Sequence, residues 1–371
     1  MILKSILLFL SLIIIPDLYI GIRYLRHTKW WVQLLWYIQG TALLFATIKL
    51  AREPDFVPDD MTKLNIYLFV FGLIAVPKAV FSLCSLCGKK GWKVGLALVP
   101  ILWIILVWGS FVGNNKLEVK HVEIAFSDLP TAFDGYRIVH FSDIHLGSIK
   151  ESLLKEVVDS INAQKADMIA FTGDIQNKNP SEIEPFMPLL STLKATDGVF
   201  SVMGNHDYAL YQKLDPYLAA RNEETTISHQ MDMKWQMLNN THRIVRRDSD
   251  LVVIAGMEND GEGRFPQKGN INYALWGIDR QQFVIMLEHD PSSWRRKILP
   301  HSHTQLTLSG HTHGMQFEIF GWAPIAFVTK EYDGLYHIGP RQLYVSKGVG
   351  GVVPFRVGAS PEIVVITLRK K

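Results

Sequence analysis

The sequence predicts a layered α/β domain, residues 116–371, preceded by a membrane region of four helices, residues 1–115. Long apolar stretches dominate the first region, whereas later apolar runs are short, rich in branched and aromatic residues, and alternate with a helical pattern. The charge balance changes at the same point. The first region holds 11 Lys and Arg against 5 Asp and Glu, and the second holds 27 against 30. This mildly acidic second region argues against nucleic-acid binding, which requires clustered positive charge.

The membrane region contains four segments that are long and apolar enough to cross a bilayer, which takes about 20 residues. These segments are roughly 5–22, 30–48, 64–87 and 92–113. They predict two helical hairpins whose partner is the lipid bilayer. The first segment is not expected to be a cleavable signal peptide, because three more spans follow it and no small-residue cleavage pattern separates them.

Two charged residues, Asp17 and Lys78, lie inside the proposed spans away from the first residues of a span, each directly after a proline. The first and third spans should run in the same direction, so the two side chains would lie at similar depth and could neutralise each other. The alternative is that each side chain reaches the nearest polar surface by itself. Two charges are too few to trace a transport path, and the sequence therefore favours anchoring over transport or sensing.

Within the second region, further elements are expected from the hydrophobic pattern. The alternating stretch 117–126 predicts a first strand, and 152–163 has the spacing of an amphipathic helix. Residues 344–351 and 363–368 predict two late strands joined by a Gly-rich turn. The polar, aromatic-containing stretch 208–245 has two interpretations, a cap over a crevice or a surface helical insertion.

Five polar clusters follow five apolar runs in the same order. The runs, read as buried strands, are 136–141, 168–172, 199–203, 283–287 and 306–309. The clusters are Asp143-x-His145, Gly173-Asp174, Gly204-Asn205-His206-Asp207, His289 and Gly310-His311-Thr312-His313. Strand carboxyl ends in an α/β sheet open on one crevice, so residues far apart in the chain can converge there.

These clusters predict a site for two divalent metal ions. Mixed carboxylate, amide and imidazole ligands are typical of catalytic transition-metal sites, and imidazole suits manganese, iron and zinc. Asp174 is the best candidate to bridge both ions, because a carboxylate has two oxygens. Asp143 and His145 project from one loop and can bind the same ion, while the neutral amide of Asn205 limits the negative charge.

Such a site permits phosphoester hydrolysis. Two ions about 3.5–4 Å apart can hold a phosphoryl group and activate a water molecule. The leaving alkoxide needs a proton, which His206 can supply if the neighbouring Asp207 orients the imidazole and favours its protonated form.

The complete series of motifs resembles the signature of the calcineurin-like metallophosphoesterase superfamily, over roughly residues 115–371. The tail, with residues 344–350 and later Pro361-Glu362-Ile363, looks like the membrane-associated bacterial branch. The resemblance implies a layered metallophosphoesterase-type β-sandwich flanked by helices. It assigns Asp143, His145, Asp174 and His313 to one metal, and Asp174, Asn205, His289 and His311 to the other.

The same resemblance gives His206 the role of proton donor, with Asp207 as its orienting partner. One departure from the family pattern is Met315, where a second glycine is expected after Gly314. The other histidines of the chain are not expected to be ligands. These are His121, His140, His229, His242, His301, His303 and His337.

The sequence therefore predicts a membrane-anchored phosphodiesterase, an integral protein of the bacterial inner membrane. An anchor keeps the site near lipid headgroups, so phospholipids, lipid-linked pyrophosphates and other envelope phosphoesters are the expected substrates. The alternatives are a soluble substrate, a pyrophosphatase acting on a nucleotide-linked lipid, and a metal-binding sensor or transporter without catalysis. Lys and Arg counts on the two sides of the membrane nearly tie, and the compact loops 23–29 and 88–93 favour an extracytoplasmic catalytic domain.

Overall fold

The computed structural model describes residues 2–53, 58 and 60–371. These form two compact units. One contains the chain up to Asn114 together with Val353–Val357, and the other contains Asn115–Val352 with Gly358–Lys371. The segment Val353–Val357, expected in the globular part, instead belongs to the helical unit, where the Arg356 amide donates a hydrogen bond to the Gly109 carbonyl at 3.1 Å.

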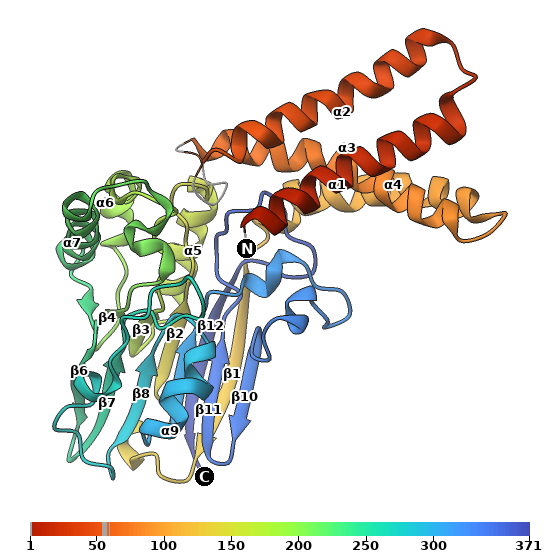
Figure 1. Cartoon of the computed structure of the whole chain (residues 1–371). Coiled ribbons are helices and arrows are strands. Elements are labelled where there is room, and N and C mark those ends of the chain that lie inside the picture. Colours follow the sequence, from red (N-terminus) through yellow and green to blue (C-terminus); the bar gives the residue numbers. More distant parts are fainter. Residues whose placement is uncertain (1, 54–57, 59) are drawn as a thin grey trace. The chain divides into compact units, whose positions relative to one another are not determined.

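The helical unit contains four helices that are long and apolar enough to cross a membrane, as expected from the sequence. They are α1 (Ile2–Ile20), which continues into the π-helical turn η1 (Gly21–Leu25), α2 (Trp30–Leu50), α3 (Met61–Leu86) and α4 (Gly91–Phe111) (Figure 1). The many large apolar side chains exposed on these helices are what a lipid environment would cover.

Asp17 of α1 and Lys78 of α3 form a buried ion pair, with 2.7 Å between Asp17 Oδ1 and Lys78 Nζ. The Lys78 ammonium also lies 4.0 Å from the ring centre of Trp36. Gly40 of α2 permits this packing, because a Cβ atom at that position would overlap the Asp17 carboxylate. The neutralising pair is therefore present, and the alternative of two separately solvated charges is wrong.

We expect Asp17→Ala to destabilise the helical unit by about 3–5 kcal/mol, because it leaves the Lys78 ammonium buried without its counter-charge. The double variant Asp17→Leu, Lys78→Met removes both charges and should recover most of that stability. Thermal unfolding of the full chain in one detergent measures both variants. Equal unfolding temperatures for the wild type and the single variant would contradict this role of the pair.

The described part of the globular unit is built on two six-stranded sheets (Figure 1). The first has the order β1 (Glu118–Phe126), β12 (Glu362–Lys370), β2 (Arg137–Phe141), β3 (Met168–Phe171), β4 (Val199–Ser201) and β5 (Gln236–Met237). The second has the order β10 (Gly334–Ile338), β11 (Arg341–Val345), β9 (Leu306–Ser309), β8 (Phe283–Leu287), β7 (Asp250–Gly256) and β6 (Thr241–Arg247).

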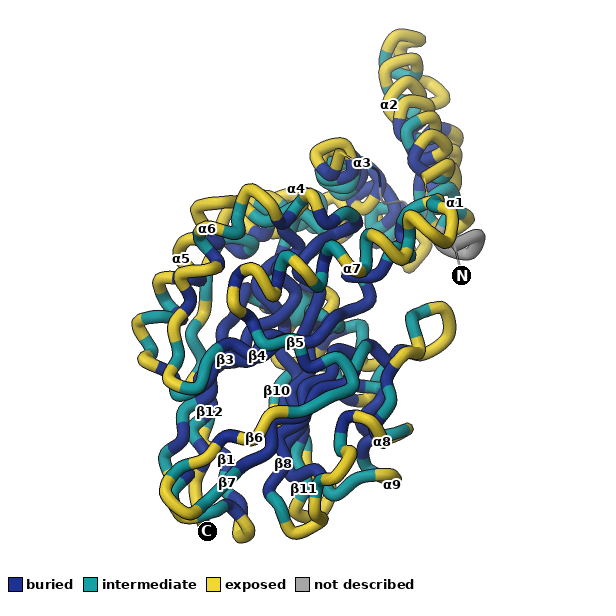
Figure 2. Tube along the Cα trace, turned by 90° about the vertical axis from the view of Figure 1, so that its left-hand side faces the viewer, coloured by how far each residue is buried: buried dark blue, intermediate teal, exposed yellow. Residues whose placement is uncertain are grey.

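The direction of the strands decides where the polar clusters lie. Strands β2 to β5 are parallel in the first sheet, and β7, β8, β9 and β11 are parallel in the second. The central strands of both sheets are almost entirely buried, as continuous apolar runs predict (Figure 2). The carboxyl ends of the parallel strands in each sheet therefore share one edge.

Three apolar clusters make the unit a sandwich with helices on both outer faces, which confirms the predicted fold class. One cluster lies between the sheets and includes Ile138 from the first and Ile285 from the second. Another joins the first sheet to α5 (Glu151–Ala163), whose buried residues recur on one helical face. The third packs α8 (Ile271–Ala274) and the π-helical turn η9 (Trp294–Ile298) on the second sheet.

Two expectations about local elements need correction. The strand expected over 344–351 ends at Val345, because the following loop turns away and its Val349 amide donates to the Ser142 carbonyl at 3.0 Å. The stretch 208–245 is not a single element, and of its two interpretations the surface helix is present, whereas the cap over a crevice stays a prediction. Its first part is buried, its middle is the surface helix α7 (Pro216–Asp232), and its end already belongs to β6.

Candidate metal centre

The seven predicted ligand residues lie together at the carboxyl ends of strands from both sheets. The first sheet contributes those that follow β2, β3 and β4, and the second contributes those that follow β8 and β9. In chain order they are Asp143, His145, Asp174, Asn205, His289, His311 and His313. The site is thus formed where the two sheets meet at one edge of the sandwich, which we call the metal rim.

The first group of donor atoms comes from Asp143, His145, Asp174 and His313. The two Nε2 atoms of His145 and His313 are 3.2 Å apart. His313 Nε2 lies 3.3 Å from Asp143 Oδ1, and His145 Nε2 lies 3.7 Å from Asp174 Oδ2. Asp143, His145 and His313 therefore face a common point, and Asp174 adjoins it through His145. His145 and Asp174 also have donor atoms close to the imidazole of His206.

The second group comes from Asp174, Asn205, His289 and His311. Asn205 Oδ1 lies 2.7 Å from His311 Nδ1 and 3.1 Å from His289 Nε2. His289 Nε2 lies 3.3 Å from Asp174 Oδ2. The same carboxylate oxygen of Asp174 therefore faces both groups, while its Oδ1 accepts a hydrogen bond from the His206 amide at 2.7 Å.

This donor arrangement fits divalent cations. Nitrogen and oxygen ligands bind zinc at about 2.0–2.2 Å, so two adjacent ligands of one ion lie roughly 3–3.5 Å apart. The distances within each group are close to this value. Neutral imidazole nitrogens that face each other at 3.2 Å, as in His145 and His313, can each direct a lone pair at one ion.

The backbone at the ligands is strained. Five of the seven adopt a left-handed conformation, which residues other than glycine seldom adopt. They are Asp143 (φ 54°), His145 (52°), Asp174 (59°), His311 (73°) and His313 (51°). Such strain costs on the order of 1–3 kcal/mol per residue and is concentrated at functional sites.

Two glycines allow the loops of the metal rim to approach one another. A Cβ atom at Gly204 would overlap the Asp174 carboxylate, and one at Gly310 would overlap the carboxylate of Asp143. The glycines of the G-N-H-D and G-H-x-H motifs therefore serve close packing between loops from different strands.

The buried charges in the site are strongly coupled. Burial raises the pKa of Asp143 to about 6 and lowers that of His145 to about 3. Burial also opposes ionisation of Asp174, but nearby imidazoles, that of His289 first, outweigh it and hold the Asp174 pKa well below its usual value. Asp174 in turn raises the pKa of His289 well above normal, against the effect of burial. A divalent ion can supply this positive charge in place of the proton.

Asp207 does not orient His206, and that expectation is wrong. The Asp207 carboxylate accepts hydrogen bonds from the backbone amides of Gly204 at 2.8 Å, Asp174 at 2.8 Å and Ile175 at 2.9 Å. It therefore ties the loop after β4 to the loop after β3.

The imidazole of His206 is held by other groups. Its Nδ1 lies 2.6 Å from the Asn177 carbonyl oxygen, which can only accept, so Nδ1 carries a proton. The opposite face stacks on the Tyr211 ring, at 4.1 Å between centroids and 15° between planes. The ring centres of His206 and the candidate ligand His145 are 4.7 Å apart, which puts His206 at the edge of the metal centre.

Tyr211 is a site residue that the motifs did not identify. Its hydroxyl accepts a hydrogen bond from the Asn205 side-chain amide at 2.8 Å, which directs the Asn205 oxygen toward His289 and His311. The one available signal was an aromatic residue in an otherwise polar stretch directly after the third cluster.

We expect Tyr211→Phe to lower kcat about 10- to 100-fold, the usual effect of removing a group that orients a metal ligand. Tyr208→Phe is the matched control, because that nearby buried tyrosine donates instead to Glu258 at 3.2 Å. Steady-state hydrolysis of a synthetic phosphodiester measures both. The predicted role of Tyr211 fails if the two variants lose activity equally.

The Met315 departure has a physical explanation. Gly314, Met315 and Gln316 all adopt positive φ, at 55°, 52° and 55°. Glycine suits such positions because it has no Cβ, so a second glycine would remove strain here. The Met315 side chain is half exposed.

The histidines excluded as ligands lie outside the two donor groups. His140 is the buried example, and its Nε2 pairs with Thr172 Oγ1 at 2.9 Å. Burial lowers its pKa to about 3. His140 is thus a neutral core residue.

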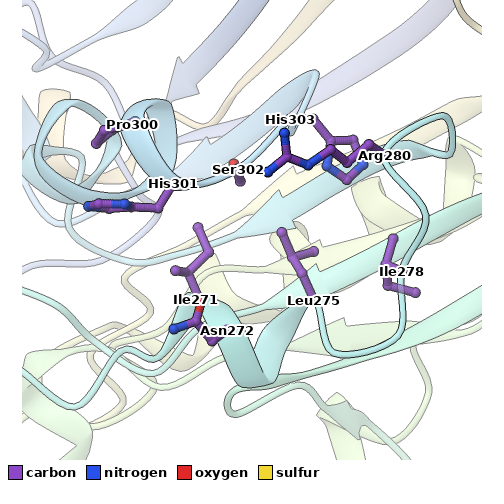
Figure 3. Close-up of a pocket in the computed structure, with 9 residues that line it drawn as sticks. All are labelled: Ile271, Asn272, Leu275, Ile278, Arg280, Pro300, His301, Ser302 and His303. Atoms are coloured by element: carbon purple, nitrogen blue, oxygen red, sulfur yellow. The ribbon is translucent and has the colours of Figure 1, made fainter.

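A cavity of about 380 Å³ adjoins the second donor group, and His311 and Asp290 are part of its wall. The apolar side chains in its wall are Phe265, Ile325 and Val328. The charged side chains are Glu262, Arg295, Arg296, Lys330 and Glu331. A different cavity of about 440 Å³ lies between the segments that precede β8 and β9, where Arg280, His301 and His303 face it (Figure 3). None of the seven candidate ligands lines that second cavity.

The chain is similar to known metallophosphoesterases. Residues 136–315 match the calcineurin-like phosphoesterase family. The Bacillus subtilis metallophosphoesterase YkuE is 31% identical over 281 residues, which cover 71% of this chain and 89% of that protein. A Campylobacter jejuni metallophosphoesterase is 29% identical over 304 residues, 77% of this chain and 75% of that protein.

A zebrafish (Danio rerio) transmembrane protein with metallophosphoesterase domain is 30% identical over 286 residues, 74% of this chain. The match spans 62% of the zebrafish protein, less than two thirds of its length. The chain belongs to the calcineurin-like metallophosphoesterase superfamily, and the predicted family is confirmed. It is therefore a metal-dependent phosphoesterase that carries four candidate membrane helices.

Proposed function

We propose that this protein is a membrane-anchored phosphodiesterase with a dinuclear metal site. The observation that carries the proposal is the position of Asp174 Oδ2, which faces His145 of one donor group and His289 of the other. Asp143, His145, Asp174 and His313 would hold one ion, and Asp174, Asn205, His289 and His311 the other. The donor types suit manganese, iron or zinc.

Two divalent ions would lower the pKa of a bound water and offset the charge of the phosphoryl group. His206 donates a proton to the leaving oxygen. Its Nδ1 hydrogen is committed to the Asn177 carbonyl, so the ring has to be the doubly protonated imidazolium to deliver a proton from Nε2. Burial lowers the pKa of His206, and the nearby Asp174 carboxylate opposes this effect by favouring the imidazolium. The Tyr211 ring stacks on the His206 imidazole, which restricts the rotation of the imidazole and so fixes the direction of Nε2.

The cavity beside His311 favours a phosphodiester over a pyrophosphate. Its arginines are engaged by acidic groups: Arg295 pairs with Glu331 at 2.6 Å, and Arg296 with Asp260 at 3.1 Å and Glu262 at 3.3 Å. The second phosphate of a pyrophosphate would have to compete with these carboxylates for the two arginine side chains. The apolar part of the wall instead suits the uncharged portion of a phospholipid or another envelope phosphoester.

The test uses the full chain in lipid nanodiscs, loaded separately with manganese, zinc or iron. We expect a phospholipid or synthetic diester to be hydrolysed with a higher kcat/KM than a nucleotide-linked lipid pyrophosphate. The opposite order would support the pyrophosphatase alternative. Stoichiometric metal binding without turnover of either substrate would support a sensor or a regulatory binder.

We further propose that the chain resides in the bacterial inner membrane with its catalytic unit on the extracytoplasmic side. Four spans leave both ends on one side, and the compact basic loops 23–29 and 88–93 favour the cytoplasm for the hairpins. A reporter that is active only in the periplasm, fused after Lys371, should be active. Activity only from a cytoplasmic reporter would reverse the orientation.

A further inference from the structure

The segment between η10 (His313–Gln316) and β10 exposes a run of large apolar side chains. We call residues 319–328 the aromatic loop. Phe320 is 105% exposed, Phe327 84% and Val328 80%, and Ile319 and Trp322 are about half exposed. Large aromatic side chains at this exposure are unfavourable in water, and a contiguous group of them marks an interaction surface.

The loop is built to present Phe320. The amides of Ile319 and Trp322 each donate to the carbonyl of the other, at 2.9 and 3.0 Å, which closes a two-residue turn. Phe320 and Gly321 at its tip both have positive φ, 52° and 76°. Phenylalanine at such a position is strained and here gains no burial, so folding stability does not explain its presence. Behind the tip, the rings of Trp322 and Phe327 make an edge-to-face contact, with 5.5 Å between their centroids.

The aromatic loop starts and ends at the metal rim. It follows β9, whose carboxyl end carries the candidate ligands His311 and His313. It precedes β10, whose first residue Gly334 pairs with the last residue of β11, Val345. The Ile325 and Val328 side chains line the same cavity as His311. The loop is therefore continuous with the wall of the proposed substrate cavity.

The chain also enters the globular unit at this rim. Strand β1 is parallel to β12, and β12 is antiparallel to β2, so Glu118 at the start of β1 lies at the end of the sheet where β2 finishes. Only six residues separate Glu118 from Phe111, the last residue of the apolar helix α4. Six residues extend at most about 20 Å. A bilayer that contains α4 is thus within reach of the metal rim.

We propose that the aromatic loop inserts into the headgroup region of the bilayer that holds the chain's own helices. Tryptophan and phenylalanine are favoured at this depth, where their rings leave water without entering the hydrocarbon centre. Lys330, which is exposed at the end of the loop, provides a positive charge for lipid phosphates. Insertion would hold the cavity mouth at the membrane surface, and it does not depend on which phosphoester the site hydrolyses.

The test places a fluorophore at the tip of the loop in the full chain. Cys84 and Cys87 are replaced by Ser, and Phe320→Cys is labelled with an environment-sensitive dye. The matched control is Ser249→Cys, in the exposed turn between β6 and β7 at the start of β7, the opposite end of the second sheet. Both proteins are reconstituted in phosphatidylcholine and phosphatidylglycerol vesicles that carry nitroxide-labelled lipids.

We expect the lipid nitroxides to quench the dye at position 320 several-fold more than the dye at 249, and aqueous iodide to show the reverse order. Equal quenching at the two positions would overturn the proposal. A dye at 320 that is shielded from iodide but not quenched by the lipids would also overturn it, because a second copy or another protein would then cover the loop.

Discussion

Replacing Asp174 with alanine is expected to abolish both metal positions and to lower kcat/KM by roughly 1,000-fold or more. The charge stabilisation supplied by bound metal is worth several kcal/mol, and each 1.36 kcal/mol corresponds to a tenfold change in rate. The effect is large because one oxygen, Asp174 Oδ2, faces His145 and His289 together. Elemental analysis of the purified full chain, with hydrolysis of a synthetic diester, measures the two consequences separately.

The control for Asp174→Ala is Asp215→Ala, which removes a carboxylate that caps α7 through the amides of Tyr217 and Leu218. This variant should keep its metal and nearly all its activity. If Asp174→Ala retains the full metal content of the wild type, the bridging role of Asp174 is refuted. Circular dichroism of each variant separates loss of metal from loss of fold.

Replacing His206 with alanine is expected to slow hydrolysis of esters with poor leaving groups by about 10²- to 10⁴-fold, the usual contribution of a general acid. Hydrolysis of p-nitrophenyl esters should fall far less, because p-nitrophenolate leaves without protonation. Metal content should stay unchanged, since the His206 side chain is bound by Asn177 and Tyr211 at the edge of the centre. Kinetics on an alkyl and a p-nitrophenyl diester provide the comparison.

His121→Ala serves as the matched control for His206, because His121 is exposed on β1. It should leave both substrates unaffected. Equal losses on the alkyl and p-nitrophenyl esters in His206→Ala would remove His206 as the acid. In that case Nε2 would have a role in binding rather than in proton transfer.

Much of the fold could be predicted because it rests on local patterns. The strands over 283–287 and 306–309 have the predicted bounds, since a short apolar run between polar residues reports burial on both faces of a sheet. Helix α5 follows from apolar spacing in the same way. The strand expected over 344–351 ended early because its second half bonds to the loop after β2, a contact that no local pattern encodes.

In the candidate site, too, some features could be predicted from local patterns and others could not. The seven candidate ligand residues could be chosen from the sequence because the clusters recur behind strands in a fixed order. The roles of Asp207 and Tyr211 could not, because each depends on a partner from another position: the amide of Asp174 for the former, and the ring of His206 for the latter. Adjacency in the chain suggested a His206–Asp207 pair, whereas the Asp207 carboxylate binds backbone amides and the His206 imidazole binds the Asn177 carbonyl.

The sequence by itself determined which side chains are available for metal chemistry, and which segments are apolar enough to cross a membrane or form buried strands. These properties depend on residue type and on short-range periodicity. Only the tertiary structure decided that candidate ligands from two sheets meet at one rim, that a single oxygen of Asp174 faces both donor groups, and that the aromatic loop is left uncovered beside them. Distances between remote segments are set by strand pairing and packing, which local patterns do not specify.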